Sequence, residues 1–426
     1  MPVQFPLSGE ELTDAVTRYG TPLYVYDENF LIERCNQLTN LFSGLPVEWL
    51  YAMKANDNPH ILEIISRNGF GLDTVSYEEV LLGLGFVSSP GEIFYTENNM
   101  TDAEMDQAIQ SGVTLNIGSY SRLEAFSRHP DAQSCCLRVN PAIGDGHHNK
   151  VVTGNAESKF GITKESIEDC IRLAKESKIR IEGLHVHIGS GIKDPSNMYD
   201  AISMMLNLAE NFESLNYLNF GGGLPVAYYP DEEEFDLNEF ERITRPLFES
   251  FLRKRDKDFR FFFEPGRWIT GPVGVLLTSV NSIKDQGMRT FLGTDTGMHH
   301  LLRPALYDAF HHIQNISRLG KPENRVYDIA GNICESGDVL GNNRKMPEAQ
   351  IGDILAIYDA GAYGMTMASH YNRRTYPAEI LRTQNGGLKE IRKRISPEEE
   401  VRRHLDDCNY TGSMNEQERH GKTDQF

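Results

Sequence analysis

Short apolar runs alternate with amphipathic stretches along the chain as far as Ile269. The runs are rich in β-branched and aromatic residues and are bounded by glycine, proline or polar residues, a pattern typical of buried strands. We predict eight strands, at Val47–Tyr51, Phe70–Val75, Glu92–Thr96, Val113–Ile117, Ser134–Val139, Arg180–Val186, Asn216–Phe220 and Phe259–Phe263.

The stretches between these runs have the spacing of amphipathic helices. One predicted helix begins near Thr163 and ends near Lys175, and another spans Asp236–Arg255, where we expect Pro246 to kink or split it. Strands that alternate with helices indicate a (β/α)8 barrel of about 250 residues or an open doubly wound sheet. The positions of the polar motifs favour the barrel, so we predict an α/β fold of this kind.

The pattern changes after Ile269, where strand-like runs are separated by polar turns rather than by helices. These runs are Val273–Ile283, Met288–Thr294, Arg325–Ala330 and Asp353–Tyr358. They predict a second, mainly β domain, a sandwich or a barrel-like unit, into which the early run Pro22–Tyr26 is expected to pair. The expected division is residues 28–272 for the barrel, with residues 1–27 and 273–426 in the β domain. Ser396 and Pro397 predict the start of a last helix, followed by a frayed tail.

The charge of the chain limits the partners to be expected. Its 426 residues include 42 Lys and Arg against 61 Asp and Glu, a formal net charge of −19, which argues against nucleic acid or an anionic membrane as partner. The apolar runs are too short to span a bilayer and no signal peptide is evident, so we expect a cytoplasmic protein. The six cysteines form no CxxC pair, and we expect reduced thiols that mostly pack in the core.

Polar and glycine-rich motifs stand at the carboxyl ends of the predicted barrel strands, where barrel enzymes carry their chemistry. In strand order they are Lys54, Asp73, Arg138, His185 with His187, Gly221-Gly222-Gly223 and Glu264-Pro265-Gly266-Arg267. Each motif alone is weak evidence, because a lysine after a strand is usually solvated and a glycine run is usually a turn. Their regular placement favours an active site.

Together the motifs suit pyridoxal phosphate. The three glycines allow backbone N–H groups to approach a phosphate, and Arg267 adds a fixed cation. Glu264 suits a protonated ring nitrogen, and Lys54 can form an imine with an aldehyde. Phosphate, ring nitrogen and aldehyde are the three groups by which a protein binds this cofactor.

Several motifs resemble those of the fold-type III pyridoxal-phosphate-dependent decarboxylases, and most closely the diaminopimelate decarboxylases. They are Tyr51–Asn56, His187–Gly191, Gly221–Gly223, Glu264–Arg267, the Cys-Glu-Ser segment in Gly331–Asp338, Asp359–Gly364 and Ser369–Asn372. The resemblance extends from about Tyr19 to Ile380. The combination of motifs is specific, although no single motif is.

The resemblance implies a role for each of these residues. Lys54 would bind the cofactor as an imine, His187 would stack on its ring, and Glu264 would keep the ring nitrogen protonated. The remaining cofactor residues would be Asp73, Arg138, Ser190, Gly221, Gly222, Gly223, Gly266, Arg267 and Tyr363.

A homodimer with shared active sites is also implied by the resemblance. The partner chain would donate the loop with Cys334, which would reprotonate the α-carbon after carbon dioxide leaves, and Glu335, which would pair with the distal ammonium of the substrate. A buried packing role is the usual one for a cysteine, but the neighbouring motif outweighs it here.

The segment around Arg303 indicates the substrate. Arg303 and Tyr307 are four residues apart, so a helix would present both on one face, and an arginine with a phenol suits a carboxylate. In the diaminopimelate decarboxylase pattern these residues, with Arg267 and Tyr363, would hold a substrate carboxylate. We therefore predict the decarboxylation of meso-2,6-diaminopimelate to L-lysine and carbon dioxide, a step of lysine biosynthesis.

Two departures from the family leave the substrate open. The pair His147-His148 stands where many relatives have His-Pro, and Trp268 stands where a small residue is common. We predict no metal site, because no Cys, Asp or Glu cluster at ligand spacing accompanies the histidines. The alternatives are decarboxylation of D-lysine, D-ornithine, ornithine or carboxynorspermidine, and a non-catalytic regulator that binds the cofactor. A regulator should have lost Lys54 or Cys334, and a racemase does not fit the Cys-Glu-Ser segment.

Overall fold

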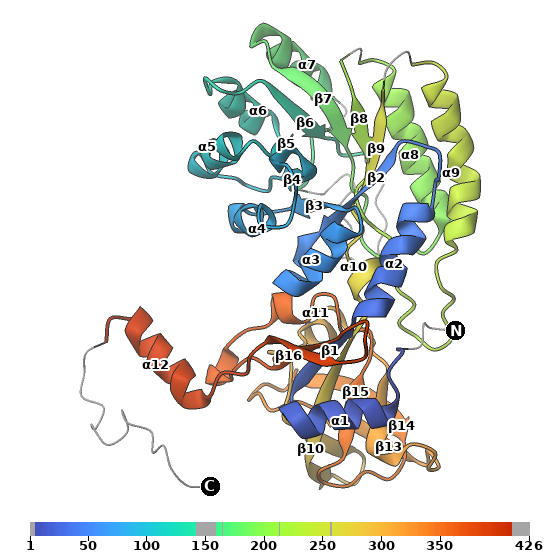
Figure 1. The fold of residues 1–426 in the computed structure, drawn as a ribbon, viewed down its shortest axis with the longest axis vertical. Helices are drawn as coiled ribbons and strands as arrows, with labels where there is room; N and C mark the ends of the chain where they lie inside the picture. Colours follow the sequence, from blue (N-terminus) through green and yellow to red (C-terminus); the bar gives the residue numbers. More distant parts are fainter. Residues whose placement is uncertain (1–4, 142–158, 164, 213, 256–257, 411–426) are drawn as a thin grey trace.

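The computed structural model describes residues 5–141, 159–163, 165–212, 214–255 and 258–410 (Figure 1). Within these ranges eight parallel strands close into a barrel in the order β2 to β9, with β9 paired back to β2. The strands are β2 Val47–Ala52, β3 Gly71–Thr74, β4 Ile93–Thr96, β5 Thr114–Ile117, β6 Ser134–Arg138, β7 Arg180–His185, β8 Tyr217–Asn219 and β9 Arg260–Phe263. All eight predicted strands are confirmed to within one residue at each end, and the open sheet is wrong.

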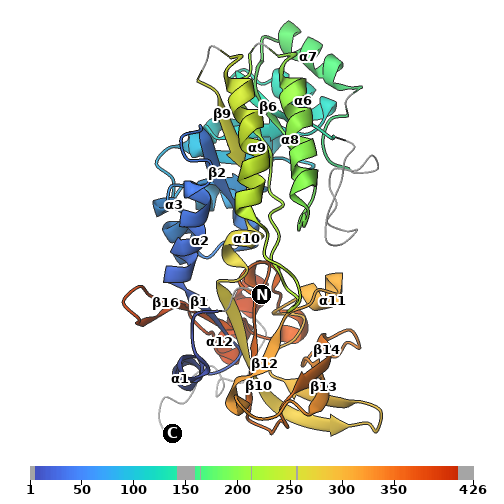
Figure 2. The same ribbon diagram turned by 90° about the vertical axis from the view of Figure 1, so that its right-hand side faces the viewer.

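Helices follow the strands around the outside of the barrel (Figures 1 and 2). They are α2 Glu28–Asn40, α3 Pro59–Arg67, α4 Tyr77–Gly83, α5 Asp102–Ser111, α6 Tyr120–Ser127, α7 Ile167–Glu176, α8 Pro195–Ala209 and α9 Leu237–Leu252. The predicted split of α9 is wrong, because the helix continues through Pro246. Phe240 and Phe248 are fully buried on either side of the proline, and this packing offsets the backbone hydrogen bond that proline cannot donate.

The interior of the barrel is filled by side chains. Leu50, Phe94, Cys136, Tyr217 and Phe262 form a separate buried cluster there. Three of them are aromatic rings, and their centroids lie 4.9 to 5.5 Å apart. The barrel is therefore a packed core, which leaves its carboxyl-terminal end as the face on which a site can form.

A second sheet follows the barrel, with strand order β14-β13-β11-β10-β1-β16-β17, and β15 pairs with both β10 and β12. The strands are β1 Leu23–Asp27, β10 Gly274–Asp285, β11 Thr290–Thr294, β12 Ile313–Asn315, β13 Arg325–Ala330, β14 Val339–Met346, β15 Ile354–Ile357, β16 Ala378–Arg382 and β17 Leu388–Arg392. The expected pairing of the early run into this sheet is confirmed, since β1 is antiparallel to β10 and parallel to β16.

The remaining helices and the 3-10 turns complete the two parts of the molecule, with η1 and η2 in the barrel. They are α1 Gly9–Tyr19, α10 Arg267–Thr270, α11 Arg303–Tyr307 and α12 Pro397–Asp407, with 3-10 turns η1 Met53–Ala55, η2 Pro90–Glu92, η4 Ile316–Arg318, η5 Met365–Met367 and η6 Tyr371–Arg373. The predicted start of α12 is confirmed, because Ser396 caps it by accepting the N–H of Glu399, with Pro397 in the first turn. The helix lies apart from the sheet (Figure 1), and most of the predicted tail, residues 411–426, lies outside the described residues.

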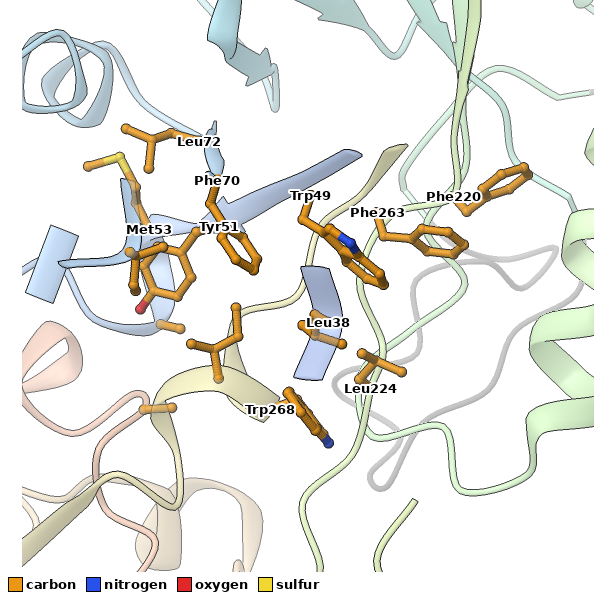
Figure 3. Close-up of a cluster of buried hydrophobic side chains, with 14 of the residues drawn as sticks. Leu38, Trp49, Tyr51, Met53, Phe70, Leu72, Phe220, Leu224, Phe263 and Trp268 are labelled. Atoms are coloured by element: carbon orange, nitrogen blue, oxygen red, sulfur yellow. The ribbon is translucent and has the colours of Figure 1, made fainter. Parts of the chain in front are cut away.

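A continuous core joins the barrel to the β domain, and Figure 3 shows part of it. In Figure 3, Leu38 of α2 lies between Trp268 of α10 and the rings of Trp49 in β2 and Phe263 in β9, whose centroids are 5.2 Å apart. The Arg34 guanidinium lies 3.4 Å from the Trp268 ring and donates two hydrogen bonds to the Trp268 carbonyl. Trp268 thus fills the junction between the two parts of the molecule.

The described residues give two further results. Cys35, Cys135, Cys136 and Cys170 are buried free thiols, which confirms the packing role expected for most cysteines, whereas Cys334 and Cys408 are exposed. No helix within the described ranges has the length and apolar character needed to cross a membrane.

Candidate active site

A cavity of about 330 Å³ opens at the carboxyl end of the barrel strands. Most of the predicted cofactor residues line it, namely Lys54, Asp73, Arg138, His187, Ser190, Gly222, Gly223, Glu264, Gly266, Arg267 and Tyr363. The other lining residues are Ala52, Val75, Thr96, Asn98, Phe160, His185 and Leu224. The volume lies in the range of small-molecule sites.

Lys54 lies in η1, directly after β2, and points to the next strand. Its Nζ is 2.5 Å from Oδ2 of Asp73, which is buried in β3. Burial alone would lower the pKa of Lys54, but Asp73, Tyr363 and Glu264 raise it above its ordinary value. Burial, with the nearby Glu264, raises the pKa of Asp73. Asp73 therefore holds the Lys54 ammonium in place at the cavity as an ion pair. The amine must lose its proton before it attacks an aldehyde.

Glu264 follows β9 and is held by two buried partners. Its Oε1 accepts a hydrogen bond from Asn219 at 2.7 Å, and its Oε2 lies 3.1 Å from Nε2 of His185. Burial would raise the pKa of Glu264, but His185, Lys54 and His187 lower it below its usual range. The carboxylate is thus ionised and fixed in orientation, as a partner of a protonated ring nitrogen must be.

His187 presents a neutral ring to the cavity. The N–H of Gly222 donates to its Nδ1 at 3.1 Å, so the ring proton lies on Nε2. Burial lowers the pKa of His187 to about 3, and the cations Arg138 and Lys54 lower it as well. A neutral imidazole can lie against an aromatic cofactor without adding charge.

The glycine run after β8 brings the backbone close to its neighbours. Gly221 has φ of +69°, and a Cβ there would lie 2.5 Å from the Val186 carbonyl oxygen. A Cβ at Gly222 would lie 2.5 Å from the Glu264 carbonyl oxygen. Gly222 and Gly223 line the cavity, whereas Gly221 does not. The N–H of Gly221 donates to Asn219, so glycine is required at this position for close approach of the backbone.

Arg267 forms the cationic wall of the cavity. Its Nε and Nη2 donate to Ser190 Oγ at 3.3 and 3.2 Å, and its Nη1 donates to the Tyr228 hydroxyl at 3.1 Å. The guanidinium lies 4.7 Å from the Tyr363 ring centroid. Tyr363 is tied to the Lys54 turn, because its N–H donates to the Ala55 carbonyl. The β domain therefore contributes to a site that is mainly built on the barrel.

The predicted substrate residues Arg303 and Tyr307 do not line the cavity, although the predicted helical segment is confirmed as α11. Arg303 is only 1% exposed and its Nη1 donates to Nε2 of His311 at 2.8 Å. Its guanidinium lies 4.3 Å from the centroid of the Tyr228 ring, which also contacts Arg267. Arg303 thus lies behind the cationic wall of the cavity.

Cys334 and Glu335 lie in an exposed loop of the β domain and do not line the cavity. Asn372 donates to the Cys334 sulfur at 3.0 Å, and the Tyr371 hydroxyl donates to Glu335. Asp338 fixes the loop by accepting backbone N–H groups. The packing alternative for Cys334 is wrong, because the residue is exposed.

Two further predictions concern the histidine pair and a metal site. His147 and His148 lie outside the described residues. In the described part of the chain, no group of three or more His, Cys, Asp or Glu residues is arranged to hold a metal ion.

Sequence reasoning gave no role to His185, Asn219 or Tyr228. His185 had a usable signal, since it lies two residues before His187 and alternate residues of an extended segment share a face. Asn219 and Tyr228 had none, because their partners are distant in the sequence.

The residues present fit pyridoxal phosphate. The cavity combines a lysine beside a proton acceptor, an ionised carboxylate, a neutral imidazole and a guanidinium with a serine hydroxyl. Two buried atoms that line this region, Asp73 Oδ1 and His185 Nδ1, have no hydrogen-bond partner among the described residues. Unsatisfied buried polar atoms at a cavity wall indicate a polar ligand.

Comparisons with known proteins give a consistent result. The family model of pyridoxal-dependent decarboxylases, pyridoxal binding domain, matches residues 29–271. Diaminopimelate decarboxylase from Methanothermobacter thermautotrophicus is 38% identical over 398 residues, 91% of this chain and 92% of that protein. The structure of diaminopimelate decarboxylase from Helicobacter pylori with L-lysine is similar at a TM-score of 0.84 and 28% identity, covering 93% of this chain and 100% of that one. The M. jannaschii diaminopimelate decarboxylase with L-lysine has a TM-score of 0.83 and 29% identity, covering 92% and 94%.

Proposed function

Because the chain belongs to the pyridoxal-dependent decarboxylase family, we propose that it converts meso-2,6-diaminopimelate to L-lysine and carbon dioxide with pyridoxal phosphate as cofactor. One observation carries the proposal: a cavity at the carboxyl end of the barrel strands brings together Lys54, Glu264 and Arg267. These residues match the aldehyde, ring nitrogen and phosphate of the cofactor. The chain that carries them is 38% identical to a diaminopimelate decarboxylase.

In this proposal the cavity residues would bind the cofactor. Lys54, with Asp73 beside its Nζ, would bind the aldehyde carbon of the cofactor, and Glu264 would pair with the ring nitrogen. His187 would face the ring, with Arg138 nearby, and the phosphate would be held by Ser190, Gly222, Gly223, Gly266, Arg267 and Tyr363. Gly221, whose N–H donates to Asn219, would keep the glycine turn in shape. The bound cofactor supplies an electron sink for the bond that breaks at the α-carbon.

The substrate residues recognise the centre that does not react. L-Lysine keeps both amino groups and one carboxylate of meso-diaminopimelate, so the carboxylate that leaves belongs to the centre opposite the one retained intact. Arg303, with Tyr307, Arg267 and Tyr363 near it, holds the retained carboxylate, and Glu335 holds the retained ammonium.

The catalytic acid comes from a second copy of the chain. Cys334 lies outside the cavity of its own chain and is exposed, which supports a homodimer in which the partner subunit donates this loop. The thiol then protonates the α-carbon after carbon dioxide leaves.

A substrate panel tests the function. The purified protein, loaded with pyridoxal phosphate, is assayed for carbon dioxide release from meso-diaminopimelate, D-lysine, D-ornithine, L-ornithine and carboxynorspermidine. We expect the largest kcat/KM for meso-diaminopimelate, with L-lysine as product by chromatography. If the protein prefers another of these amino acids, only the broader function of an amino acid decarboxylase remains. If it releases carbon dioxide from none of them, the result indicates a non-catalytic regulator.

Substrate choice should depend on Arg303. We expect Arg303→Lys to lower kcat/KM for meso-diaminopimelate by roughly ten- to a hundredfold relative to D-lysine, because a hydrogen bond to a charged group contributes about 1.5–3 kcal/mol and lysine lacks the guanidinium fork. The ratio of the two constants is measured, since it cancels general damage to the fold. Arg18→Lys, which alters an exposed ion pair with Asp14, is the control. Equal losses for both substrates would make Arg303 structural.

A further inference from the structure

The buried guanidinium of Arg303 is fixed on one side by a histidine of known tautomer. Arginine cannot accept a hydrogen bond, so Nη1 of Arg303 donates to Nε2 of His311 at 2.8 Å. Nε2 then carries no proton, and the ring proton on Nδ1 donates to the Tyr358 carbonyl at 2.8 Å. The chain of two hydrogen bonds anchors the Arg303 side chain to the backbone beyond β15.

His311 stays neutral in this position. Burial lowers its pKa well below the ordinary value, and the charge of Arg303 lowers it further, more than the hydrogen bond to Tyr358 raises it. A neutral ring keeps Nε2 as an acceptor, whereas a protonated ring would turn a donor toward Nη1. The contact between His311 and Arg303 therefore persists across the working pH range of an enzyme.

Tyr228 fixes the plane of the guanidinium. The Arg303 Cζ lies 4.3 Å from the centroid of the Tyr228 ring, and His311 packs against the same ring edge-on at 5.4 Å. The hydroxyl of Tyr228 accepts a hydrogen bond from Arg267 on the cavity wall. A single aromatic ring thus sets the position of Arg303 relative to the cavity.

The opposite edge of Arg303 has an unsatisfied donor. Its Nε is buried and has no acceptor among the described residues. An unsatisfied buried donor costs about 1–3 kcal/mol, and more for a charged group, unless a ligand supplies the acceptor. Nε and Nη2 together form a fork that matches the two oxygens of a carboxylate. Asp359 acts on Arg303 through its charge, but the described contacts include no hydrogen bond between the two.

We propose that His311 and Tyr228 are positioning residues that lock Arg303 so that its Nε–Nη2 edge receives the carboxylate of the bound amino acid. The proposal rests on the proposed function, which supplies a substrate and a product with a carboxylate at the unreacted centre. His311 occupies Nη1 and thereby excludes the Nη1–Nη2 end of the guanidinium as the binding edge. Tyr228 prevents the guanidinium plane of Arg303 from rotating away from the carboxylate.

A comparison of two ligands isolates the contribution of the carboxylate to binding. L-Lysine carries it, and cadaverine is the same molecule without it. Their affinities for the protein loaded with pyridoxal phosphate are measured by calorimetry, which does not depend on turnover. We expect His311→Phe to weaken L-lysine binding roughly ten- to a hundredfold and cadaverine binding by no more than about twofold, because a misaligned fork loses a hydrogen bond to a charged group.

Three further variants make the test specific. His311→Gln keeps an acceptor and should restore most of the L-lysine affinity, while Tyr228→Leu removes the ring from the guanidinium and should act like His311→Phe. His312→Phe is the matched control, since the neighbouring His312 is exposed and stacks on Tyr358. It should leave both affinities unchanged.

The outcomes separate the two proposals. If the wild type decarboxylates meso-diaminopimelate and prefers L-lysine to cadaverine, but His311→Phe and Tyr228→Leu weaken both ligands equally or neither, the positioning role is wrong and the proposed function stands. If the wild type binds both ligands equally, no carboxylate is recognised and the positioning role is also wrong. Absence of turnover with meso-diaminopimelate rejects the proposed function by itself.

Discussion

Cys334 has surroundings unlike those of the buried cysteines. Its sulfur accepts a hydrogen bond from Asn372, and the adjacent Glu335 is held by Tyr371, so the loop presents both side chains at the surface. We expect Cys334→Ala to reduce kcat roughly 10²–10⁴-fold, the usual contribution of a general acid, and to leave cofactor content unchanged. Rate and cofactor absorbance are measured together. Cys408→Ala, at the other exposed cysteine, is the control, and an unchanged rate for Cys334→Ala would remove it from the mechanism.

Asp359 is a buried carboxylate that should make stability depend on pH. Burial, with Glu234 nearby, raises the pKa of Asp359 to about 7 from an ordinary value of 3.8, against the opposing effect of Arg303 and Arg34. Between these values the unfolded chain releases the proton and the folded chain keeps it, so stability falls as pH rises through this window.

Replacing the Asp359 carboxylate should remove the loss of stability that occurs as pH rises. Asparagine has nearly the same shape and tolerates the φ of +54° at position 359. We expect Asp359→Asn to raise the Tm above that of the wild type at pH 8 and to change it little at pH 4. Asp308→Asn, at an exposed residue with φ of +51°, is the matched control. An equal shift of Tm at both pH values would contradict the raised pKa.

Residues with a chemical role differ in how well the sequence predicts them. Lys54 and Glu264 follow barrel strands, and the fold itself brings such positions to one face. His311 and Tyr228 lie in loops without a motif, and their importance comes from Arg303, which they meet only in the folded chain. A sequence pattern reports position along an element, whereas these contacts depend on how distant loops pack.

At the scale of elements, all the barrel strands were predicted, whereas four strands of the second sheet were not. The barrel strands are apolar runs with both faces covered, so hydrophobicity marks them. Strands β12, β14, β16 and β17 were missed. β14 contains the polar segment Gly341–Lys345, and β17 has exposed charged residues at Lys389 and Glu390. Pairing with a neighbour, which the sequence does not show, makes these segments strands.

Packing inside the barrel gives a test at the same scale. A Cβ at Gly183 of β7 would lie 1.9 Å from a ring carbon of Tyr217 in β8, inside a closed set of strands. We expect Gly183→Ala to destabilise the protein by about 1–3 kcal/mol through overpacking, seen as a lower midpoint in urea unfolding. Gly91→Ala, where the added carbon meets only a serine oxygen at 3.8 Å, should have little effect. Similar midpoints for the two variants would contradict the packing described.

The whole molecule combines a barrel and a β domain, for which we propose residues 28–272 and residues 1–27 with 273–426. The barrel carries Lys54, and the β domain carries the exposed Cys334, which does not line the cavity of its own chain. A complete active site therefore requires, in our proposal, the barrel of one subunit and the β domain of another.

Mixed dimers test this arrangement. Lys54→Ala and Cys334→Ala should each be nearly inactive, whereas subunit exchange between them should restore part of the activity, because one of the two sites in a mixed dimer then has both residues. Activity is followed after mixing, and exchange is confirmed by native mass spectrometry. Complete exchange without recovered activity would show that each site is built within one subunit.

The position of β1 determines when the second sheet can form during synthesis. Its residues 23–27 pair on one side with β10 and on the other with residues 378–382 of β16, about 350 residues later in the chain. The barrel strands, in contrast, pair with their successors in sequence and can assemble while the ribosome is still translating. A nascent chain can therefore pair one edge of β1 with β10 soon after the barrel is made, whereas the other edge has no partner until β16 is made. An unpaired strand edge of this kind can pair with another chain, so it exposes the newborn protein to aggregation until β16 covers it.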